Sequence, residues 1–350
     1  MSLEFEPLWF DSMGAKSTCT QVKTPDVNIV LDPGVAIMHP SFPATDMQKQ
    51  QWLKAAEEKI KKSCKKADVV TISHYHYDHY SPKDISIYED KKLFAKNPNY
   101  YINNQQRHRA EDFYDKLYKK YKIEDKDKIY DPTITEKFPD PINDLPIAKN
   151  KDFGDYNKRR KEVLAKGKKR YDKLVKNWIL YNNLPEIHSK KIKINFPEGK
   201  KYTFKDTKIS FTKPLFHGIE YATVGWVVGT IIQYKKTKLI HTSDVRGPMI
   251  EDYADMIIKE KPQILIMDGP TTYLFGYILN RINLERTINN TLHIIKKIQP
   301  EILIWDHHLT REEKFKKRTK KVWDYAKEHK INLKTASEYL GKEPVLKIDD

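Results

Sequence analysis

The sequence has little cysteine and no long hydrophobic run, and each shortage excludes a class of protein. Its 350 residues include two cysteines, Cys19 and Cys64, and no CxxC pair, which excludes a disulfide scaffold and argues against a thiolate metal site. No window approaches the roughly 20 consecutive apolar residues of a membrane span. The first residues, MSLEFEPLWFDSMG, carry acids where a signal peptide needs basic residues. We therefore expect a cytoplasmic protein without a membrane partner, whose metals, if any, are held by histidine and carboxylate side chains.

Positive charge exceeds negative charge, and the excess is concentrated in one region. The whole chain has 64 Lys and Arg against 48 Asp and Glu, a formal net charge of +16. Residues 104–193 have 24 basic against 15 acidic residues and contain two long polar stretches of helical character, Gln105–Lys122 and Asp155–Tyr181. We predict that residues 104–193 are a helical basic insertion within a single domain formed by residues 1–103 and 194–350.

Outside the insertion, the hydrophobic pattern alternates between strands and helices. Residues 1–31 contain three short β-prone runs, and residues 46–64 have the apolar spacing of a helix with Thr45 or Asp46 as its N-cap. The other expected elements are the strand ADVVTIS, a helix over 82–96, a strand over 99–103, the strands KIKINF, KYTF, KISF, QILIMD and EILIWD, and helices over 283–298 and 311–329. This order predicts a layered α/β domain with the insertion at its rim.

A dense cluster of possible metal ligands follows one of the apolar strands. The run ADVVTIS ends at Ser73, and the motif SHYHYDHY then places His74, His76, Asp78 and His79 within six residues. In an extended segment, side chains two residues apart point the same way, so His74 and His76 can bind one cation. Asp78 and His79 lie past the extended part, where a turn can aim them at a second cation. This spacing is typical of a metal site.

Further candidates occur in the same setting, a polar side chain after an apolar strand. They are His217 after KISFTKPLF, Asp244 after KLIHTS, and the adjacent His307 and His308 after EILIWD. Together the candidates predict two sites: His74, His76 and His217 for one metal, and Asp78, His79 and either His307 or His308 for the other, with Asp244 able to bridge. Nitrogen and oxygen ligands without thiolates favour two zinc ions, with iron or manganese as alternatives.

SHYHYDH, with the downstream His217, Asp244 and His307 or His308, closely resembles the five-motif signature of the metallo-β-lactamase superfamily. Asp32 in VLDPG resembles the first motif of that signature, an aspartate that supports the metal site. The WFDSMGAKS start, the DHHL motif and the long insertion resemble an archaeal branch of predicted hydrolases in this superfamily. The resemblance implies an α/β fold, the αββα metallo-β-lactamase-like sandwich with its metals at one edge, and the activity of a metal-dependent hydrolase.

Comparison with the superfamily's redox members refines the expected chemistry. Members that perform redox chemistry on iron resemble HxExD and usually carry a flavin domain, and this sequence has neither feature, so we predict hydrolysis. The adjacent His307 and His308 leave the last ligand open, and we favour His307 because it comes first after the strand. Asp78 and Asp244 are the expected catalytic carboxylates, because one of them can orient the hydroxide that a two-metal centre generates, or accept its proton.

The sequence is compatible with three functions: a hydrolase of small molecules, a nuclease, and a nucleic-acid-binding protein. A small-molecule substrate would be an ester, thioester, lactone or phosphodiester. A nuclease acting on RNA or DNA is indicated by the basic insertion, by 10 basic against 4 acidic residues over Arg311–Lys334, and by DGPTTY, which faintly resembles a segment of the superfamily's nucleases. A nucleic-acid-binding protein with structural metals is the weakest hypothesis, because structural zinc sites are usually closed tetrahedra of four ligands.

Two further groups of residues lie near these motifs. In the GAKS turn between the first two strands, Ser12, Lys16 and Ser17 are candidates for contact with an anionic substrate, and an ordinary polar hairpin turn is the alternative. Three tyrosines, Tyr75, Tyr77 and Tyr80, alternate with the ligands, and we expect at least two of them to pack in the core.

Overall fold

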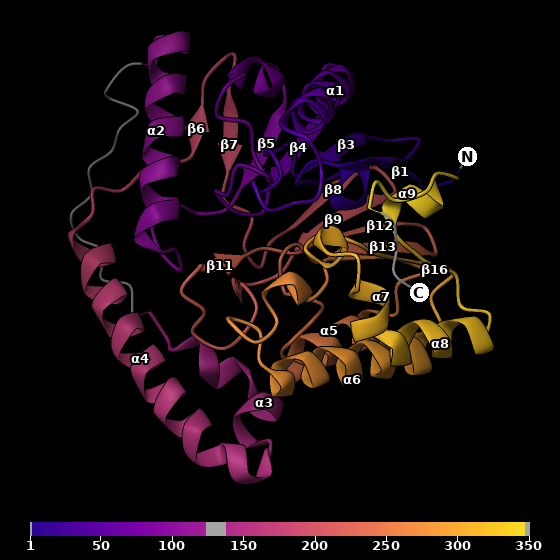
Figure 1. The fold of residues 1–350 in the computed structure, drawn as a ribbon. Helices are drawn as coiled ribbons and strands as arrows, with labels where there is room; N and C mark the ends of the chain where they lie inside the picture. The colour runs from indigo at the N-terminus through magenta and orange to yellow at the C-terminus, as the bar shows by residue number, and fades with distance from the viewer. Residues whose placement is uncertain (1, 124–137, 347–350) are drawn as a thin grey trace.

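The chain forms two seven-stranded sheets that pack face to face in the computed structural model, which describes residues 2–123 and 138–346 (Figure 1). The first sheet has the order β1 (Glu4–Phe10), β2 (Thr18–Lys23), β3 (Asn28–Leu31), β4 (Val69–Ile72), β5 (Lys92–Ala95), β7 (Lys193–Asn195) and β6 (Ile187–His188). The second has the order β16 (Leu333–Lys334), β15 (Ile302–Trp305), β14 (Ile264–Met267), β13 (Thr237–His241), β12 (Thr230–Tyr234), β9 (Thr207–Phe211) and β8 (Lys201–Phe204). β10 (Leu215–Phe216) and β11 (Trp226–Val227) form a separate pair.

Both sheets combine an antiparallel part with a parallel part. β1, β2 and β3 are antiparallel, and β3, β4, β5 and β7 are parallel. In the second sheet β8, β9, β12 and β13 are antiparallel, whereas β13, β14, β15 and β16 are parallel. Loops that follow parallel strands leave a sheet at its carboxyl edge, where side chains from several strands meet. The loops after β4, β13 and β15 carry most of the predicted ligands.

The inner faces of the two sheets share one apolar layer. It joins Ile29 and Leu31 of the first sheet to Ile232, Leu239 and Ile266 of the second, and all five side chains are buried. Burial of one such side chain stabilises the fold by about 1.5–3 kcal/mol. This layer fixes the two sheets relative to each other and therefore fixes the loops at their edges.

Helices cover the two outer faces (Figure 1). α1 (Asp46–Cys64) and α2 (Asn104–Tyr121) cover the first sheet, and α5 (Glu251–Glu260), α6 (Arg281–Ile298) and α8 (Lys320–Glu328) cover the second. The shorter helices are α3 (Pro146–Asn150), α7 (Phe315–Arg318) and α9 (Ala336–Tyr339), and the long helix α4 (Asn157–Leu180) runs along one side. The predicted αββα sandwich is confirmed.

Local sequence signals predict α1 well and β5 poorly. The helix begins and ends as predicted, and Thr45 is its N-cap, in a capping box with Gln48. The predicted helix over 82–96 is wrong, because Lys92–Ala95 is a central strand whose Leu93 and Phe94 are buried on opposite faces of the sheet. A short strand buried on both faces has no alternation of polar and apolar residues to distinguish it from a helix. The strand expected over 99–103 is also wrong, since that segment is a series of bends.

The predicted insertion contributes to the core of the first sheet. α2 buries Ala110, Phe113, Tyr114 and Leu117 in the same cluster as the outer face of that sheet, and β6 pairs with the strand β7, which begins at the end of the insertion. The insertion also contains residues 124–137, which lie outside the described residues. The division of the chain at residues 104 and 193 remains a prediction. None of the helices in the described part of the chain is long and apolar enough to span a bilayer.

Candidate metal centre

The predicted ligands come from four separate loops and meet at one edge of the sandwich. The loop after β4 supplies His74, His76, Asp78 and His79. The others are His217 directly after β10, Asp244 after β13, and His307 with His308 after β15. Their side chains form three overlapping groups of ligand atoms, within each of which the atoms lie within 4.8 Å of one another: His74, His76, His217 and Asp244; Asp78, His79 and His307; and Asp244, His307 and His308.

The first group has the spacing of ligands on one metal ion. His74 Nε2 lies 3.0 Å from His76 Nδ1, and Asp244 Oδ2 lies 3.0 Å from His217 Nε2 and 3.6 Å from His74 Nε2. Tetrahedral ligands with metal bonds of about 2.0–2.2 Å are separated from one another by about 3.3–3.6 Å. The four side chains therefore surround a space of the size that one divalent cation needs.

The second group also contacts the Asp244 carboxylate. His307 Nε2 is 3.7 Å from Asp78 Oδ2 and 3.6 Å from Asp244 Oδ1, and His79 Nε2 is 3.1 Å from Asp244 Oδ2. Oδ1 of Asp244 thus faces His307, whereas Oδ2 faces His79 as well as His217 and His74 of the first group. This is the geometry that the bridging role predicted for Asp244 requires.

Several atoms in this cluster are buried without a hydrogen-bond partner among the described residues. They are His79 Nε2, both ring nitrogens of His217, both oxygens of Asp244, and His307 Nε2. A buried polar atom left unsatisfied destabilises a fold by about 1–3 kcal/mol. A bound cation would satisfy several of these atoms at once, so the donor set fits divalent metal ions with mixed nitrogen and oxygen ligands.

Buried carboxylates orient two of the histidines in the same way. Asp32 lies 2.9 Å from His79 Nδ1, and it accepts hydrogen bonds from the backbone N–H of Ser73 at 2.7 Å and from the Ser73 hydroxyl at 2.6 Å. Asp11 lies 2.8 Å from His307 Nδ1. Both histidines therefore present Nε2 toward the centre, as in carboxylate–histidine–metal arrangements. The geometry agrees with the supporting role predicted for Asp32, whereas Asp11 was not predicted.

Burial and neighbouring charges give the histidines different pKa values, so some rings are neutral near pH 7 and others are protonated. Burial lowers the pKa of His74, His76 and His217, and that of His76 falls to about 3, so these rings are neutral near pH 7. Burial also lowers the pKa of His79, but Asp244 and Asp32 outweigh it and raise the value to about 10. Asp244 is held ionised, because His79 and His307 outweigh the burial that would raise its pKa. Burial lowers the pKa of His307 as well, but Asp11 and Asp244 outweigh it and raise that pKa. A metal would therefore displace protons from His79 and His307 on binding.

His307 and His308 occupy different surroundings. Asp11 holds Nδ1 of His307, whereas His308 has a left-handed backbone, with φ of 66°, and places Nδ1 3.4 Å from Asp268 Oδ2. His308 Nε2 is 3.8 Å from Asp244 Oδ2, so both rings lie near the bridge. The anchored ring is the better candidate ligand, in agreement with the preference for the first histidine after the strand.

Replacement of each of these histidines by alanine is expected to give different results. His307→Ala should reduce bound metal from about two ions per chain to about one and lower turnover about a hundredfold or more, because it removes a ligand of the second group. His308→Ala should keep both ions and lose less than about tenfold. Elemental analysis of the two variants, with turnover measured on the same samples, makes the comparison. Equal effects would contradict the assignment of His307 as the ligand.

Other residues near the motifs have structural roles. The Ser12 hydroxyl donates to the Ser337 hydroxyl, and the Ser17 hydroxyl donates to the Gly34 carbonyl at 2.7 Å, which favours the alternative of an ordinary polar turn for these two serines. The sequence of the turn does not reveal these hydrogen-bond partners, because Ser337 and Gly34 lie outside the turn. Tyr75 and Tyr80 are buried, as expected for core packing, and Tyr77 is 43% exposed.

Two arginines beside the centre were also missed by the sequence analysis. Arg311 donates from Nε to Asp11 and lies with Nη2 3.6 Å from Asp78 Oδ2. Arg246 follows Asp244 by two residues, and its Nε has no hydrogen-bond partner among the described residues. Nothing in their local sequence distinguishes them from the many other basic residues of the chain.

Comparisons with known proteins show which family the chain belongs to. A family model described as a β-lactamase superfamily domain matches residues 15–135. A UPF0282 protein of Methanocaldococcus jannaschii is 31% identical over 97% of this chain and 92% of its own length. Among solved structures, the metallo-β-lactamase fold protein YhfI of Bacillus subtilis has a TM-score of 0.41 at 13% identity, covering 87% of this chain and 85% of its own. The short form of human tRNase Z has a TM-score of 0.39 at 10% identity, covering 88% and 92%. The chain has the metallo-β-lactamase fold and belongs to the UPF0282 protein family.

Proposed function

We propose that this protein is a metal-dependent hydrolase with a dinuclear centre, in which zinc is the first choice of metal and iron or manganese are the alternatives. The position of Asp244 between two groups of ligand atoms carries the proposal, because one carboxylate can then serve two cations. Two bound divalent cations supply a hydroxide nucleophile at neutral pH and polarise the oxygen of the scissile bond. His74, His76 and His217 bind on one side, and Asp78, His79 and His307 on the other.

The side chains of the centre have separate tasks in such a reaction. Asp78 and Asp244 are the carboxylates available to orient an attacking water or to accept its proton, and both are held ionised by neighbouring histidines. Asp32 and Asp11 fix the rings of His79 and His307, which keeps the ligand atoms in place between turnovers. The chain therefore needs no nucleophilic side chain of its own.

The test combines metal analysis with a substrate panel. Protein reconstituted with zinc, iron or manganese should hold close to two ions per chain and hydrolyse one class among esters, thioesters, lactones, phosphodiesters and RNA. Only stray metal after reconstitution would contradict the proposal. Two bound ions without hydrolysis of any class would favour a metal-containing binding protein.

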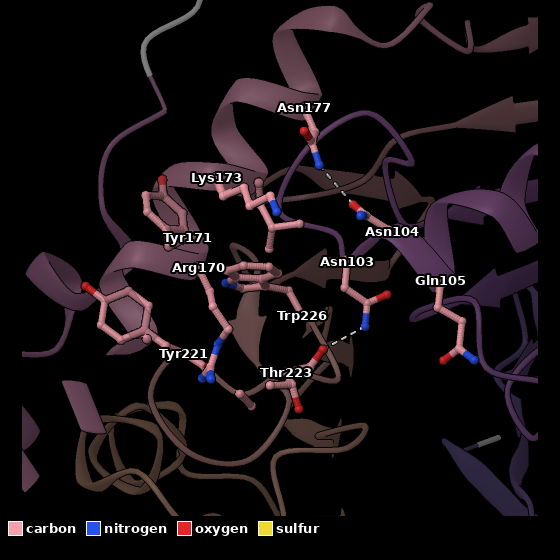
Figure 2. Close-up of a pocket in the computed structure, with 13 residues that line it drawn as sticks. Asn103, Asn104, Gln105, Arg170, Tyr171, Lys173, Asn177, Tyr221, Thr223 and Trp226 are labelled. Carbon is pink, nitrogen blue, oxygen red and sulfur yellow. Dashed lines mark hydrogen bonds between the residues drawn. The ribbon is translucent and has the colours of Figure 1, made fainter. Parts of the chain in front are cut away.

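A second candidate function, a nuclease acting on RNA or DNA, is supported by a cavity between α4, the start of α2 and the loop before β11. The cavity has a volume of about 440 Å³, and Arg170 and Lys173 of α4 line it together with Asn103 and Asn104 at the start of α2 (Figure 2). Gln106, the residue after the lining residue Gln105, lies with its Nε2 3.4 Å from His76 Nε2 and donates to the Val224 carbonyl at 2.6 Å. Cationic and amide side chains of this kind bind phosphate and sugar groups of nucleic acids.

A charge-removal experiment separates the nuclease from a small-molecule hydrolase. Arg170→Gln with Lys173→Gln should weaken binding of single-stranded RNA and reduce the slope of log affinity against log salt by about 0.7 for each lost phosphate contact. Lys158→Gln with Lys161→Gln is the matched control, because both lysines are exposed on the same helix. Arg160 is left unchanged because it pairs with the buried Glu220 at 2.9 Å. Absence of RNA binding by the parent at low salt would favour a small-molecule substrate.

A further inference from the structure

Three basic side chains lie beside the candidate metal centre. Lys16 comes from the turn between β1 and β2, Arg246 from the loop after β13, and Arg311 from the loop after β15. Within the described part of the chain, the Lys16 ammonium has no carboxylate within 4 Å, although Asp78 and Asp11 are near enough to affect its pKa. Lys16 is neither a candidate metal ligand nor a hydrogen-bond partner of one, so the metal centre alone does not explain its position.

Hydrogen-bonding capacity also remains unused on both arginines. Arg311 donates to Asp11 from Nε and to the Tyr273 hydroxyl from Nη1 at 3.2 Å, while its buried Nη2 has no hydrogen-bond partner among the described residues. Arg246 Nε is likewise buried and unpartnered in this part of the structure. The Arg246 side chain packs under the residue after His217, where a methyl group on Gly218 would lie 2.8 Å from Arg246 Cδ. Both guanidinium groups are thus fixed close to the centre with free donors.

A cavity of about 470 Å³ opens onto two of these side chains, Lys16 and Arg311, whereas Arg246 does not line it. Lys16, Tyr273 and Arg311 line it on the side of the metal centre, and His39 and Phe42 line the other side. Of its two acidic lining residues, Glu312 pairs with Arg318, and Glu313 is exposed to solvent. The cavity therefore presents cationic and hydroxyl donors, and the carboxylate that faces Arg311 Nη2 is Asp78, whose Oδ2 lies 3.6 Å away.

The electrostatics of this cluster favour an anion. Arg311 pairs with Asp11 and lies 3.6 Å from Asp78, whereas Lys16 and Arg246 have no carboxylate within 4 Å of their side-chain nitrogens among the described residues, so the cations are incompletely compensated and repel one another. Divalent cations in the adjacent centre would add to the positive potential. An anion that enters the cavity relieves this repulsion and satisfies the free donors. The donors come from three separate loops, which suits a tetrahedral anion with oxygens in several directions better than a planar carboxylate.

We propose that Lys16, Arg246 and Arg311 form an anion subsite that binds a phosphoryl group of the substrate beside the metal centre. The subsite narrows the proposed hydrolase to phosphate esters, and in that respect it depends on the proposed function. Binding of phosphate itself does not depend on turnover. The subsite also gives Lys16 the role in anion contact predicted for the GAKS turn, while Ser12 and Ser17 hold the turn in place.

The first test measures binding of inorganic phosphate by calorimetry to the metal-loaded protein. Lys16→Met and Arg246→Met should each raise the dissociation constant about tenfold or more, with metal content unchanged. Lys54→Met and Arg281→Met are the matched controls, because both positions are exposed, and they should bind phosphate as the parent does. Arg246→Lys keeps the charge and should recover part of the loss if Arg246→Met is poorly folded. No phosphate binding by the parent, or equal affinity in Lys16→Met and Arg246→Met, would overturn the subsite.

A second measurement separates this inference from the proposed function. For Lys16→Met, the KM for bis(4-nitrophenyl) phosphate should rise about tenfold while the KM for the neutral 4-nitrophenyl acetate stays unchanged. An equal rise for both esters would overturn the preference for phosphate. Phosphate binding that depends on Lys16, in a protein that hydrolyses neither ester, would support the subsite and contradict the hydrolase. Stronger binding of acetate than of phosphate would overturn the assignment of a tetrahedral anion.

Discussion

Asp244→Asn is expected to abolish turnover and to reduce bound metal from about two ions per chain to one or fewer. The carboxylate lies between the two groups of ligands, 3.0 Å from His217 Nε2 on one side and 3.6 Å from His307 Nε2 on the other. An amide keeps the shape but loses the negative charge and one of the two acceptor oxygens. Loss of several kcal/mol of transition-state stabilisation corresponds to at least about a thousandfold in rate.

The Asp244→Asn experiment needs a measure of folding beside the measure of activity. Circular dichroism should show an intact fold, because Asp244 contacts the histidines of the centre and contributes no apolar packing. Asp115→Asn is the matched control, since Asp115 is exposed on α2 and should retain metal and activity. An Asp244→Asn protein that holds two ions and turns over at the parental rate would show that another group bridges the metals, or that the two groups act independently.

The parts of the structure that sequence analysis predicts well are those specified by neighbouring residues. α1 is defined by its own apolar spacing and by the Thr45 cap, so its two ends follow from the sequence. His74, His76, Asp78 and His79 share one loop, and their spacing alone brings them to the same edge. His217, Asp244 and His307 are distant in the chain, but each follows an apolar strand, which was sufficient to predict that they meet.

The parts that were missed depend on contacts between distant segments. Asp11 orients His307 from 296 residues away, and its own sequence, a single acid after a strand, resembles many others. β5 lacks polar and apolar alternation because both of its faces are buried, one under α2 and one between the sheets.

A buried ion-pair network attaches the predicted insertion to the second half of the fold. Arg286 of α6 lies between two carboxylates, with Nη2 2.8 Å from Glu220 Oε1 and 2.7 Å from Glu251 Oε2. Two cations from the insertion complete the network, Arg160 on Glu220 at 2.9 Å and Lys151 on Glu251 at 2.8 Å. Glu220 follows His217 by three residues, so the network also holds the loop that carries this ligand.

Arg286→Met is therefore expected to lower the free energy of unfolding by about 3 kcal/mol at pH 7. Both carboxylates stay buried, and each keeps only one cationic partner. Burial raises the pKa of Glu220 and Glu251, but Arg286 outweighs it and holds both below their usual value. An acid with a depressed pKa in the folded state stabilises the fold above its unfolded pKa of about 4.3, and this contribution is lost as the pH falls. The difference between parent and variant should consequently shrink as the pH falls below about 4.3 toward the depressed folded-state pKa values.

Urea unfolding at pH 7 and at about pH 3.5 measures both parts of this prediction. Arg281→Met, at an exposed position of the same helix, is the matched control and should change the free energy of unfolding by less than about 0.5 kcal/mol. Combining Arg286→Met with Glu220→Gln should recover part of the loss, because one of the uncompensated charges is then removed. Equal stability of Arg286→Met and Arg281→Met at pH 7 would show that Arg160 and Lys151 alone compensate the two carboxylates. A loss that is the same at both pH values would mean that it comes from packing of the Arg286 side chain against Phe153, whose ring lies 5.1 Å from the guanidinium carbon.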